Sequence, residues 1–328
     1  MLQRTADRAL TLVDWDHIII ITNAAHKKMV MAQLPEVVEH NIILEPEKRD
    51  TALAMLVGAI YARNLDPQAV IMNSASDHFV VDSDLPEFAR TMRKACRMAA
   101  EGDNLVTVGI APRGPETGFG YIKVGEQVDN DKKLPVFRVD SFTEKPNLAT
   151  ATAFIATGRY FWNANMYVWS AEALVQAFAK HAPKILAAAQ PLVGASAKEF
   201  ARQLTSVYAA SPAISIDYAI SEKADNLLLI PGNFAWSDVG DWKVAYELGK
   251  KDAADNVCNL SGKCELVTHE ARANLVTGSG ERLLALVGVD NLVVVDTPDI
   301  LLIAQKSRSQ EVKKIVEQLK KNKRQEYL

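Results

Sequence analysis

His17-Ile18-Ile19-Ile20-Ile21-Thr22-Asn23 is the stretch that decides the fold class. A short, continuous β-branched run is typical of a strand buried on both faces, as in a parallel sheet. Outward from it, apolar runs of strand length alternate with segments of helical spacing. This alternation predicts an α/β fold built on a doubly wound, mostly parallel sheet. Strands are expected at residues 41–45, 69–73 and 105–110, and helices at residues 2–13, 25–34, 51–62 and 85–100.

The second half of the chain continues this pattern and then changes. Further strands are expected at residues 136–143, 161–169 and 227–231, and further helices at residues 151–157, 171–180, 198–208, 216–222 and 242–248. The composition turns polar over residues 249–256, which indicates a domain boundary. Beyond it, short apolar runs separated by turn residues predict a small β-rich domain closed by a helix at 309–321. The expected domains are residues 1–250 and 251–328, and we see no strict repeat period.

The composition limits the partners. Of 328 residues, 48% are hydrophobic and 23% charged, with a net charge of -3. Without a basic excess, no nucleic acid is expected, and without an apolar run of about 18 residues, no membrane is expected. The three cysteines, Cys96, Cys258 and Cys264, do not form the pattern of a disulfide framework or a zinc site and favour a reducing compartment. The expected location is cytoplasmic.

Acidic side chains and a lysine lie where a ligand is expected. In doubly wound sheets, ligands bind beyond the carboxyl ends of the strands, where the predicted strands deliver Glu45 and Asp77. Phe142-Thr143-Glu144-Lys145-Pro146 and Trp236-Ser237-Asp238-Val239-Gly240-Asp241-Trp242 add further acids and a lysine. Two carboxylates brought together from distant strand ends can hold Mg²⁺, which phosphate chemistry usually needs.

Several runs, taken in order, are typical of one family. They are Leu44-Glu45-Pro46-Glu47-Lys48-Arg49-Asp50-Thr51-Ala52, Ser76-Asp77-His78, Gly109-Ile110-Ala111-Pro112, Pro115-Glu116-Thr117-Gly118-Phe119-Gly120-Tyr121-Ile122, Phe142-Thr143-Glu144-Lys145-Pro146, Trp162-Asn163-Ala164-Asn165-Met166, Ser215-Ile216-Asp217-Tyr218-Ala219, Trp236-Ser237-Asp238-Val239-Gly240-Asp241-Trp242 and Asn291-Leu292-Val293-Val294-Val295-Asp296-Thr297-Pro298-Asp299. Over essentially its whole length, the chain resembles the mannose-1-phosphate guanylyltransferases, which are sugar-nucleotide pyrophosphorylases. The resemblance implies a Rossmann-like nucleotidyltransferase domain that converts GTP and mannose 1-phosphate to GDP-mannose and pyrophosphate. It also implies Mg²⁺ as cofactor, and a homo-oligomer is possible through the β-rich tail.

The resemblance assigns roles to individual residues. It implies that Asp77 and Asp238 hold the Mg²⁺ and are catalytic together with Lys145. It implies two groups of substrate-binding residues. Those near the base are Glu45, Arg49 and Thr51, and those near the sugar phosphate are Gly118, Tyr121, Glu144, Lys145 and Asn163. Two alternatives stay open from the residues alone: Asp77 could cap the next helix, and Lys145 could be an ordinary surface residue.

The sequence departs from the family at its beginning. A first strand leading into G-G-x-G-T-R would lie before Leu2 and is absent, although this loop binds the triphosphate through its backbone N–H groups. Asp50 stands where the family usually has asparagine, and Asn165 where it usually has glycine. We therefore expect an N-terminal fragment with impaired activity, and a gap in the sheet beside residues 18–21. The alternatives are a non-catalytic sugar-phosphate-binding or regulatory subunit, or a sister sugar-1-phosphate nucleotidyltransferase.

Overall fold

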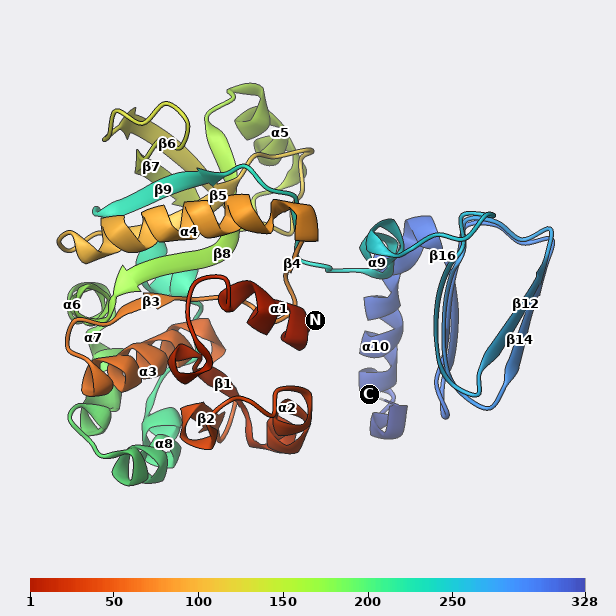
Figure 1. Ribbon diagram of the computed structural model, residues 1–328, viewed down its shortest axis with the longest axis horizontal. Helices are drawn as coiled ribbons and strands as arrows, with labels where there is room; N and C mark the ends of the chain where they lie inside the picture. The colour runs from red at the N-terminus through yellow and green to blue at the C-terminus, as the bar shows by residue number, and fades with distance from the viewer. Residues whose placement is uncertain (328) are drawn as a thin grey trace. The chain divides into compact units, whose positions relative to one another are not determined.

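The structure is a computed structural model that describes residues 1–327. Its tertiary contacts divide the chain into two compact units, one ending at Trp236 and one beginning at Ser237 (Figure 1). The polar stretch 249–256, which suggests a boundary at residue 250, lies inside the second unit. The division into residues 1–250 and 251–328 therefore stays a prediction. No helix in the described part of the chain is long and apolar enough to cross a bilayer.

A six-stranded mixed sheet forms the centre of the first unit. Its strands, in spatial order, are β3 (Val70–Met72), β8 (Tyr160–Ser170), β5 (Leu105–Ile110), β9 (Leu227–Gly232), β7 (Phe137–Thr143) and β6 (Tyr121–Gln127). Only β5 and β9 pair in parallel, whereas the other pairings are antiparallel. Because β6 also pairs with β8, the sheet curls towards closure.

The prediction of a mostly parallel sheet is wrong for this six-stranded sheet, although the α/β class is confirmed. The buried runs that suggested parallel strands have another cause, since helices cover both faces of the sheet. The helix α4 (Leu85–Ala100) packs on the face that carries Val106 and Val108. The helices α3 (Asp50–Leu65) and α6 (Ala171–His181) pack on the other face (Figure 1). Burial on both faces does not specify strand direction, so the sequence pattern could not reveal it.

The first apolar run forms a separate small sheet. The strands β1 (Ile20–Asn23) and β2 (Ile42–Glu45) pair in parallel with each other. Within residues 1–327, no strand is hydrogen-bonded to both β1 and β3, and the gap expected beside residues 18–21 stays a prediction. The Ile21 side chain packs instead on α3, where its Cδ1 would lie 3.0 Å from a β-carbon built at Gly58. Glycine at residue 58 lets β1 approach the helix closely.

The second unit is a stack of parallel coils. The strands β11 (Val257–Gly262), β13 (Leu275–Gly280) and β15 (Leu292–Asp296) pair in parallel, as do β12 (Glu265–His269) and β14 (Leu283–Val287). Val257, Leu275 and Val293 share one register position, so each coil is 18 residues long. The β-rich prediction is confirmed, but the statement that no strict repeat exists is wrong. Some equivalent positions are identical, such as Ser261 and Ser279 or Gly262 and Gly280, but others differ, so the period is weak in the sequence.

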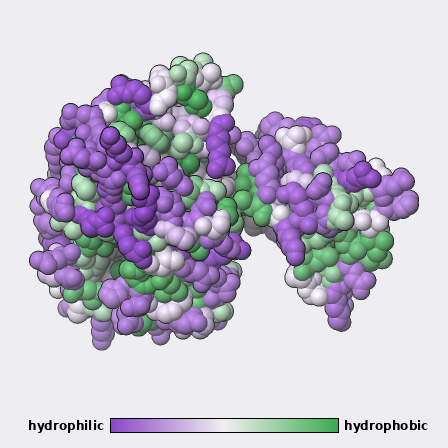
Figure 2. Space-filling model, turned by 45° about the horizontal axis from the view of Figure 1, so that its top comes forward, coloured by the Kyte–Doolittle hydropathy of each residue, from purple (hydrophilic) through white to green (hydrophobic). Residues whose placement is uncertain are grey.

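The remaining elements support these two centres. The expected helix over 198–208 is α8 (Ala197–Ala210), which carries a capping box of Ser196 and Glu199. The expected helix over 216–222 is a π-helical turn, Asp217–Ser221. Both units present a mostly hydrophilic face in Figure 2. The other helices and short strands are α1 (Leu2–Ala9), α2 (Lys27–Gln33), β4 (Phe79–Val80), α5 (Leu148–Ala156), α7 (Pro183–Ala189), α8 (Ala197–Ala210), β10 (Trp236–Ser237), α9 (Trp242–Leu248), β16 (Leu301–Gln305) and α10 (Val312–Lys321).

Candidate active site

The turn after β7 brings Glu144 and Lys145 together. Lys145 Nζ lies 2.8 Å from Glu144 Oε1, and the side chains are 62% and 9% exposed, respectively. Burial raises the pKa of Glu144, while the pair with Lys145 opposes this shift. The same pair raises the pKa of Lys145, so its ammonium stays charged. Lys145 adopts the left-handed backbone conformation, with φ of 46°.

A glycine lies directly under the Glu144 carboxylate. A β-carbon at Gly120 would stand 2.6 Å from Glu144 Oε2, so any larger residue would displace the carboxylate. A β-carbon at Gly118 would meet nothing within 4 Å, and this exposed residue leaves its backbone open to approach. The Tyr121 ring is completely buried, and its hydroxyl donates to the Glu116 carbonyl at 3.0 Å. The Tyr121 hydroxyl therefore holds the glycine loop, and a role of Tyr121 in substrate binding stays a prediction.

Asn163 belongs to a network beneath the Glu144–Lys145 pair. Its Nδ2 donates to Asp217 Oδ1 at 3.0 Å and to the Tyr167 hydroxyl at 3.3 Å. The Tyr167 hydroxyl in turn donates to Asp217 Oδ1 at 2.8 Å. Charge interactions with Asp217 also shift the pKa values of Glu144 and Lys145 upward. The structure thus adds Asp217 to the predicted group. Its signal in the sequence is the run Ser215-Ile216-Asp217-Tyr218-Ala219, an acid among apolar residues.

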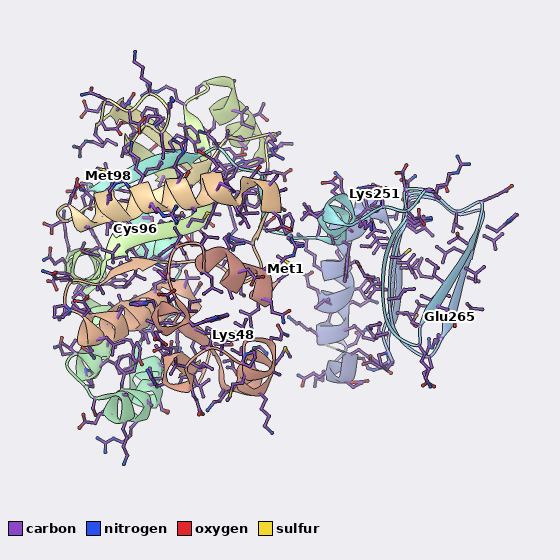
Figure 3. All side chains as sticks on the ribbon, in the orientation of Figure 1. Met1, Lys48, Cys96, Met98, Lys251 and Glu265 are labelled. Atoms are coloured by element: carbon purple, nitrogen blue, oxygen red, sulfur yellow. The ribbon has the colours of Figure 1, made fainter. Side chains whose placement is uncertain are left out.

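The residues predicted to lie near the base form a second group at the end of β2 and the start of α3. Glu45 Oε1 accepts a hydrogen bond of 3.0 Å from the Tyr208 hydroxyl, and burial raises the pKa of Glu45. Arg49 pairs with Glu47 at 2.9 Å. Lys48, labelled in Figure 3, lies in the same turn. The carboxyl group of Asp50 accepts from the Thr51 amide at 2.7 Å, and Asp50 is left-handed with φ of 62°.

One short segment joins the two groups. The amide of Ile216 donates to the Thr51 hydroxyl at 2.9 Å, and Ala52 N donates to Ile214 O at 3.2 Å. The next residue, Asp217, holds Asn163. The structure thereby fixes Thr51 at the start of α3 relative to Asn163 in β8. A ligand contacting both groups would meet a preorganised surface.

Asp77 lies in a third place, on the loop between β3 and β4. Its side chain is exposed, and the next helical turn begins at Asp82 after Val81, so Asp77 does not cap it. The loop is fastened by α1. The Arg8 guanidinium donates to His78 O at 3.1 Å and Ser74 Oγ at 3.2 Å, and the Thr5 hydroxyl donates to Ser76 O at 3.2 Å.

The predicted partner of Asp77 is described separately. Asp238 belongs to the second unit, where its Oδ1 accepts from the Gly240 amide at 3.3 Å. The convergence of Asp77 and Asp238 on one cation therefore stays a prediction. Within residues 1–327, no group of three or more His, Cys, Asp or Glu side chains is arranged to hold a metal alone.

Comparison with known proteins decides the family. Residues 1–255 match the family model described as nucleotidyl transferase, and residues 265–319 match the MannoseP isomerase/GMP-like beta-helix domain. The whole chain is 36% identical to the mannose-1-phosphate guanylyltransferase of Escherichia coli K12, of which it covers 68%. The chain belongs to the mannose-1-phosphate guanylyltransferase family. A Klebsiella pneumoniae enzyme of the same name is 37% identical over 100% of this chain and 68% of its own length.

Solved structures of this family and its neighbours share the fold. A structure described as mannose-1-phosphate geranyltransferase from Thermus thermophilus has a TM-score of 0.80 and 28% identity, covering 97% of this chain and 89% of its own. A structure described as mannose-6-phosphate isomerase from Helicobacter pylori has a TM-score of 0.58 and 25% identity, covering 72% and 89%, respectively. Membership in the guanylyltransferase family thus agrees with both the α/β unit and the coiled unit.

Proposed function

We propose that this chain transfers the guanylyl group of GTP to mannose 1-phosphate, giving GDP-mannose and pyrophosphate. The observation that carries the proposal is identity of 36% along the entire chain to an enzyme of that name, with the Glu144–Lys145 pair at a predicted sugar site. An oxygen of the sugar phosphate attacks the α-phosphorus of GTP in line, and pyrophosphate leaves. This chemistry needs positioning and charge neutralisation, with no covalent intermediate.

The two groups of residues divide the substrates between them. Lys145 pairs with the phosphate of the sugar, and the Glu144 carboxylate accepts hydrogen bonds from sugar hydroxyls. Asn163 and the backbone at Gly118 complete the sugar pocket, while Tyr121 supports the glycine loop. The base of the nucleotide lies near the second group of residues, which consists of Glu45, Arg49 and Thr51. Supporting this division, the amide of residue 216 ties the two groups together.

The chain offers suitable donors for Mg²⁺. Asp77 presents an exposed carboxylate on a loop held by buried hydrogen bonds, and Asp238 supplies a second carboxylate on the other unit. Carboxylates together with substrate phosphates are the ligands that Mg²⁺ prefers. When bound, the ion offsets the charge of the phosphates. Asp77 and Asp238 would hold it, and Lys145 would add the third charged group of the proposed catalytic set.

A pyrophosphate-release assay tests the proposal. The chain is given mannose 1-phosphate with GTP, ATP or dTTP in turn, and GTP with glucose 1-phosphate as the sugar control. Release with GTP and mannose 1-phosphate should exceed the other combinations and stop when EDTA removes divalent cations. Binding of mannose 1-phosphate without release for any nucleotide would favour a non-catalytic binding or regulatory subunit. Faster release with another pair would favour a sister nucleotidyltransferase. The impaired activity expected from the sequence has no support in the comparisons, so we do not propose it.

Three further proposals concern the setting of this activity. We infer that residues 1–250 act as the transferase domain and residues 251–328 as a small β-rich domain. The β-rich domain, residues 251–328, is the proposed contact in a homo-oligomer. Sedimentation of the chain with and without these residues would test this. The cysteines are unpaired among the described residues, which supports a cytoplasmic location.

A further inference from the structure

The carboxylate of Asp217 is bound on one side only. Its Oδ1 accepts two hydrogen bonds, from Asn163 Nδ2 at 3.0 Å and from the Tyr167 hydroxyl at 2.8 Å. No residue among the described ones donates to its Oδ2. The side chain is partly exposed and therefore accessible to a ligand. A carboxylate oxygen has two acceptor positions, so Asp217 keeps strong acceptor capacity free.

The neighbours of Asp217 have little capacity left. Both N–H groups of the Asn163 amide are used, and its Oδ1 accepts from the Asn165 amide at 3.1 Å. The Tyr167 hydroxyl donates once and accepts twice, from Asn163 and from Ser221 Oγ at 2.9 Å. A hydroxyl has one donor and two acceptor positions, so Tyr167 is saturated. Of this network, Asp217 offers a ligand the strongest acceptor.

The network also holds Asp217 rigidly. The Tyr167 ring is completely buried, and Ser221 is 3% exposed. Asp217 and Ser221 are the ends of the π-helical turn, a type of helix that is frequent at functional sites. An acceptor fixed by buried partners loses little freedom when a ligand arrives.

The charges around Asp217 suit one class of ligand. Glu144, Asp217 and Glu222 supply three carboxylates near a single ammonium, Lys145, and Glu222 Oε1 accepts from the Glu144 amide at 3.3 Å. Such a site is poor for a ligand that carries several anionic groups, because the carboxylates repel them. It suits a neutral, hydroxyl-rich ring with one anionic group, because hydroxyls donate to carboxylates and the ammonium takes the anion.

We propose that Asp217 Oδ2 accepts a hydrogen bond from a ring hydroxyl of the sugar 1-phosphate and so helps to select the sugar. This inference rests on the proposed function. Glu144 and Asp217 then read two positions of the ring, while Asn163 acts mainly by orienting Asp217. The site would then discriminate against a sugar that lacks this hydroxyl, since the half-buried Asp217 carboxylate would be left without its donor.

The test uses the full chain and the variant Asp217→Asn. Asparagine keeps the shape and the bonds to Asn163 and Tyr167 but removes the charge. We expect the Kd for mannose 1-phosphate, measured by calorimetry, and its KM to rise about tenfold, with the KM for GTP unchanged. The control is Asp225→Asn, an exposed acid that pairs with Lys180 on the surface. Thermal melts establish that both variants fold.

Monodeoxy mannose 1-phosphates identify the hydroxyl. For the unchanged protein, removing one particular hydroxyl should raise the Kd about tenfold or more. For that analogue alone, Asp217→Asn should raise the Kd by less than a further twofold, because the contact is already lost. Equal losses for every analogue in both proteins would overturn the role of Asp217. An unchanged Kd in Asp217→Asn would do the same. If the unchanged protein binds mannose 1-phosphate no better than glucose 1-phosphate and releases no pyrophosphate, the proposed function itself has failed, which is a distinct result.

Discussion

The Tyr208 hydroxyl donates a hydrogen bond of 3.0 Å to Glu45 Oε1, joining residues 163 positions apart. Burial raises the pKa of Glu45 above its ordinary value of 4.5, and this bond partly lowers it again. The same contact and burial raise the pKa of Tyr208, so its hydroxyl stays protonated and donates. The bond thus favours the charged form of a half-buried carboxylate at the end of β2.

Removing that donor should destabilise the protein in a pH-dependent way. Tyr208→Phe raises the pKa of Glu45 further in the folded state, so ionising the carboxyl costs more folding free energy. We expect a loss of about 1 kcal/mol at pH 7, which shrinks below about pH 4.5, where the carboxyl is neutral in both states. Urea unfolding at pH 7 and pH 4 measures it. Tyr160→Phe is the control, because its hydroxyl bonds to no described residue, and an equal loss at both pH values would contradict the linkage.

Thr51 should couple the two groups of site residues. Thr51→Val removes the acceptor of the Ile216 amide while keeping the side-chain shape. An unpaired, partly buried amide should cost about 1–2 kcal/mol of unfolding free energy. Because Ile216 precedes Asp217, the KM values for both GTP and mannose 1-phosphate should rise. Thr51→Ser restores the acceptor and should restore both values. If Thr51→Val raises the KM for GTP alone, residues 214–217 do not couple the two groups.

Gly120 should tolerate no side chain. Gly120→Ala would place a β-carbon 2.6 Å from Glu144 Oε2, so the carboxylate must move. We expect affinity for mannose 1-phosphate to fall about tenfold or more, since a displaced acceptor loses its bond to the sugar. Isothermal calorimetry measures this. Gly114→Ala, in the same loop, is the matched control, because its β-carbon would meet nothing within 4 Å. Equal behaviour of the two variants would refute the steric argument.

Arg8 should act as a positioning residue for Asp77. It is 3% exposed, and burial lowers the pKa of its guanidinium. Arg8→Met keeps most of the packing but leaves His78 O and Ser74 Oγ without their donor, at a cost of about 2 kcal/mol. If Asp77 holds Mg²⁺, the Mg²⁺ concentration that gives half-maximal pyrophosphate release should rise several-fold.

The control for this prediction is a nearby surface arginine. Arg4→Met removes an exposed ion pair with Asp82 and should change neither the unfolding free energy nor the Mg²⁺ requirement appreciably. Loss of stability in Arg8→Met with an unaltered Mg²⁺ requirement would separate the packing role of Arg8 from any role in positioning Asp77.

Asn274 should matter for the coiled unit alone. It is completely buried, and its side chain bonds Asn256 Oδ1 at 3.1 Å, Val289 O at 3.0 Å and the Leu292 amide at 2.8 Å. Asn274→Ala leaves the Leu292 amide unpaired and removes one of two donors each from Asn256 Oδ1 and Val289 O, so we expect about 2 kcal/mol less protection from local unfolding. Hydrogen exchange should show the loss in residues 256–305 and not in the α/β unit. An equal loss of exchange protection in both units would contradict the prediction that Asn274 stabilises the coiled unit alone.

Local sequence specified many of the elements. Residues 85–100 and 105–110 read as helix and strand, and the structure has α4 and β5 over these residues. Their hydrophobic periods are local properties, and short turns bound them. Strand direction is different, since β8 lies between β3 and β5 and runs antiparallel to both. A strand in a sheet covered by helices on both faces has the same apolar sequence pattern whether it runs parallel or antiparallel to its neighbours.

For the candidate site, the sequence determined the chemistry and the tertiary structure decided the partners. The runs around Glu144 and Asn163 indicated a sugar-phosphate site through their residue types and order. Only the fold brought Asp217 beneath them, because that contact depends on the register of β8 against the turn at 217–221. Likewise, the 18-residue coil rests on hydrogen-bond register between strands, and only some of the paired positions are identical. Contacts between distant residues arise from packing the whole chain, so no local pattern encodes them.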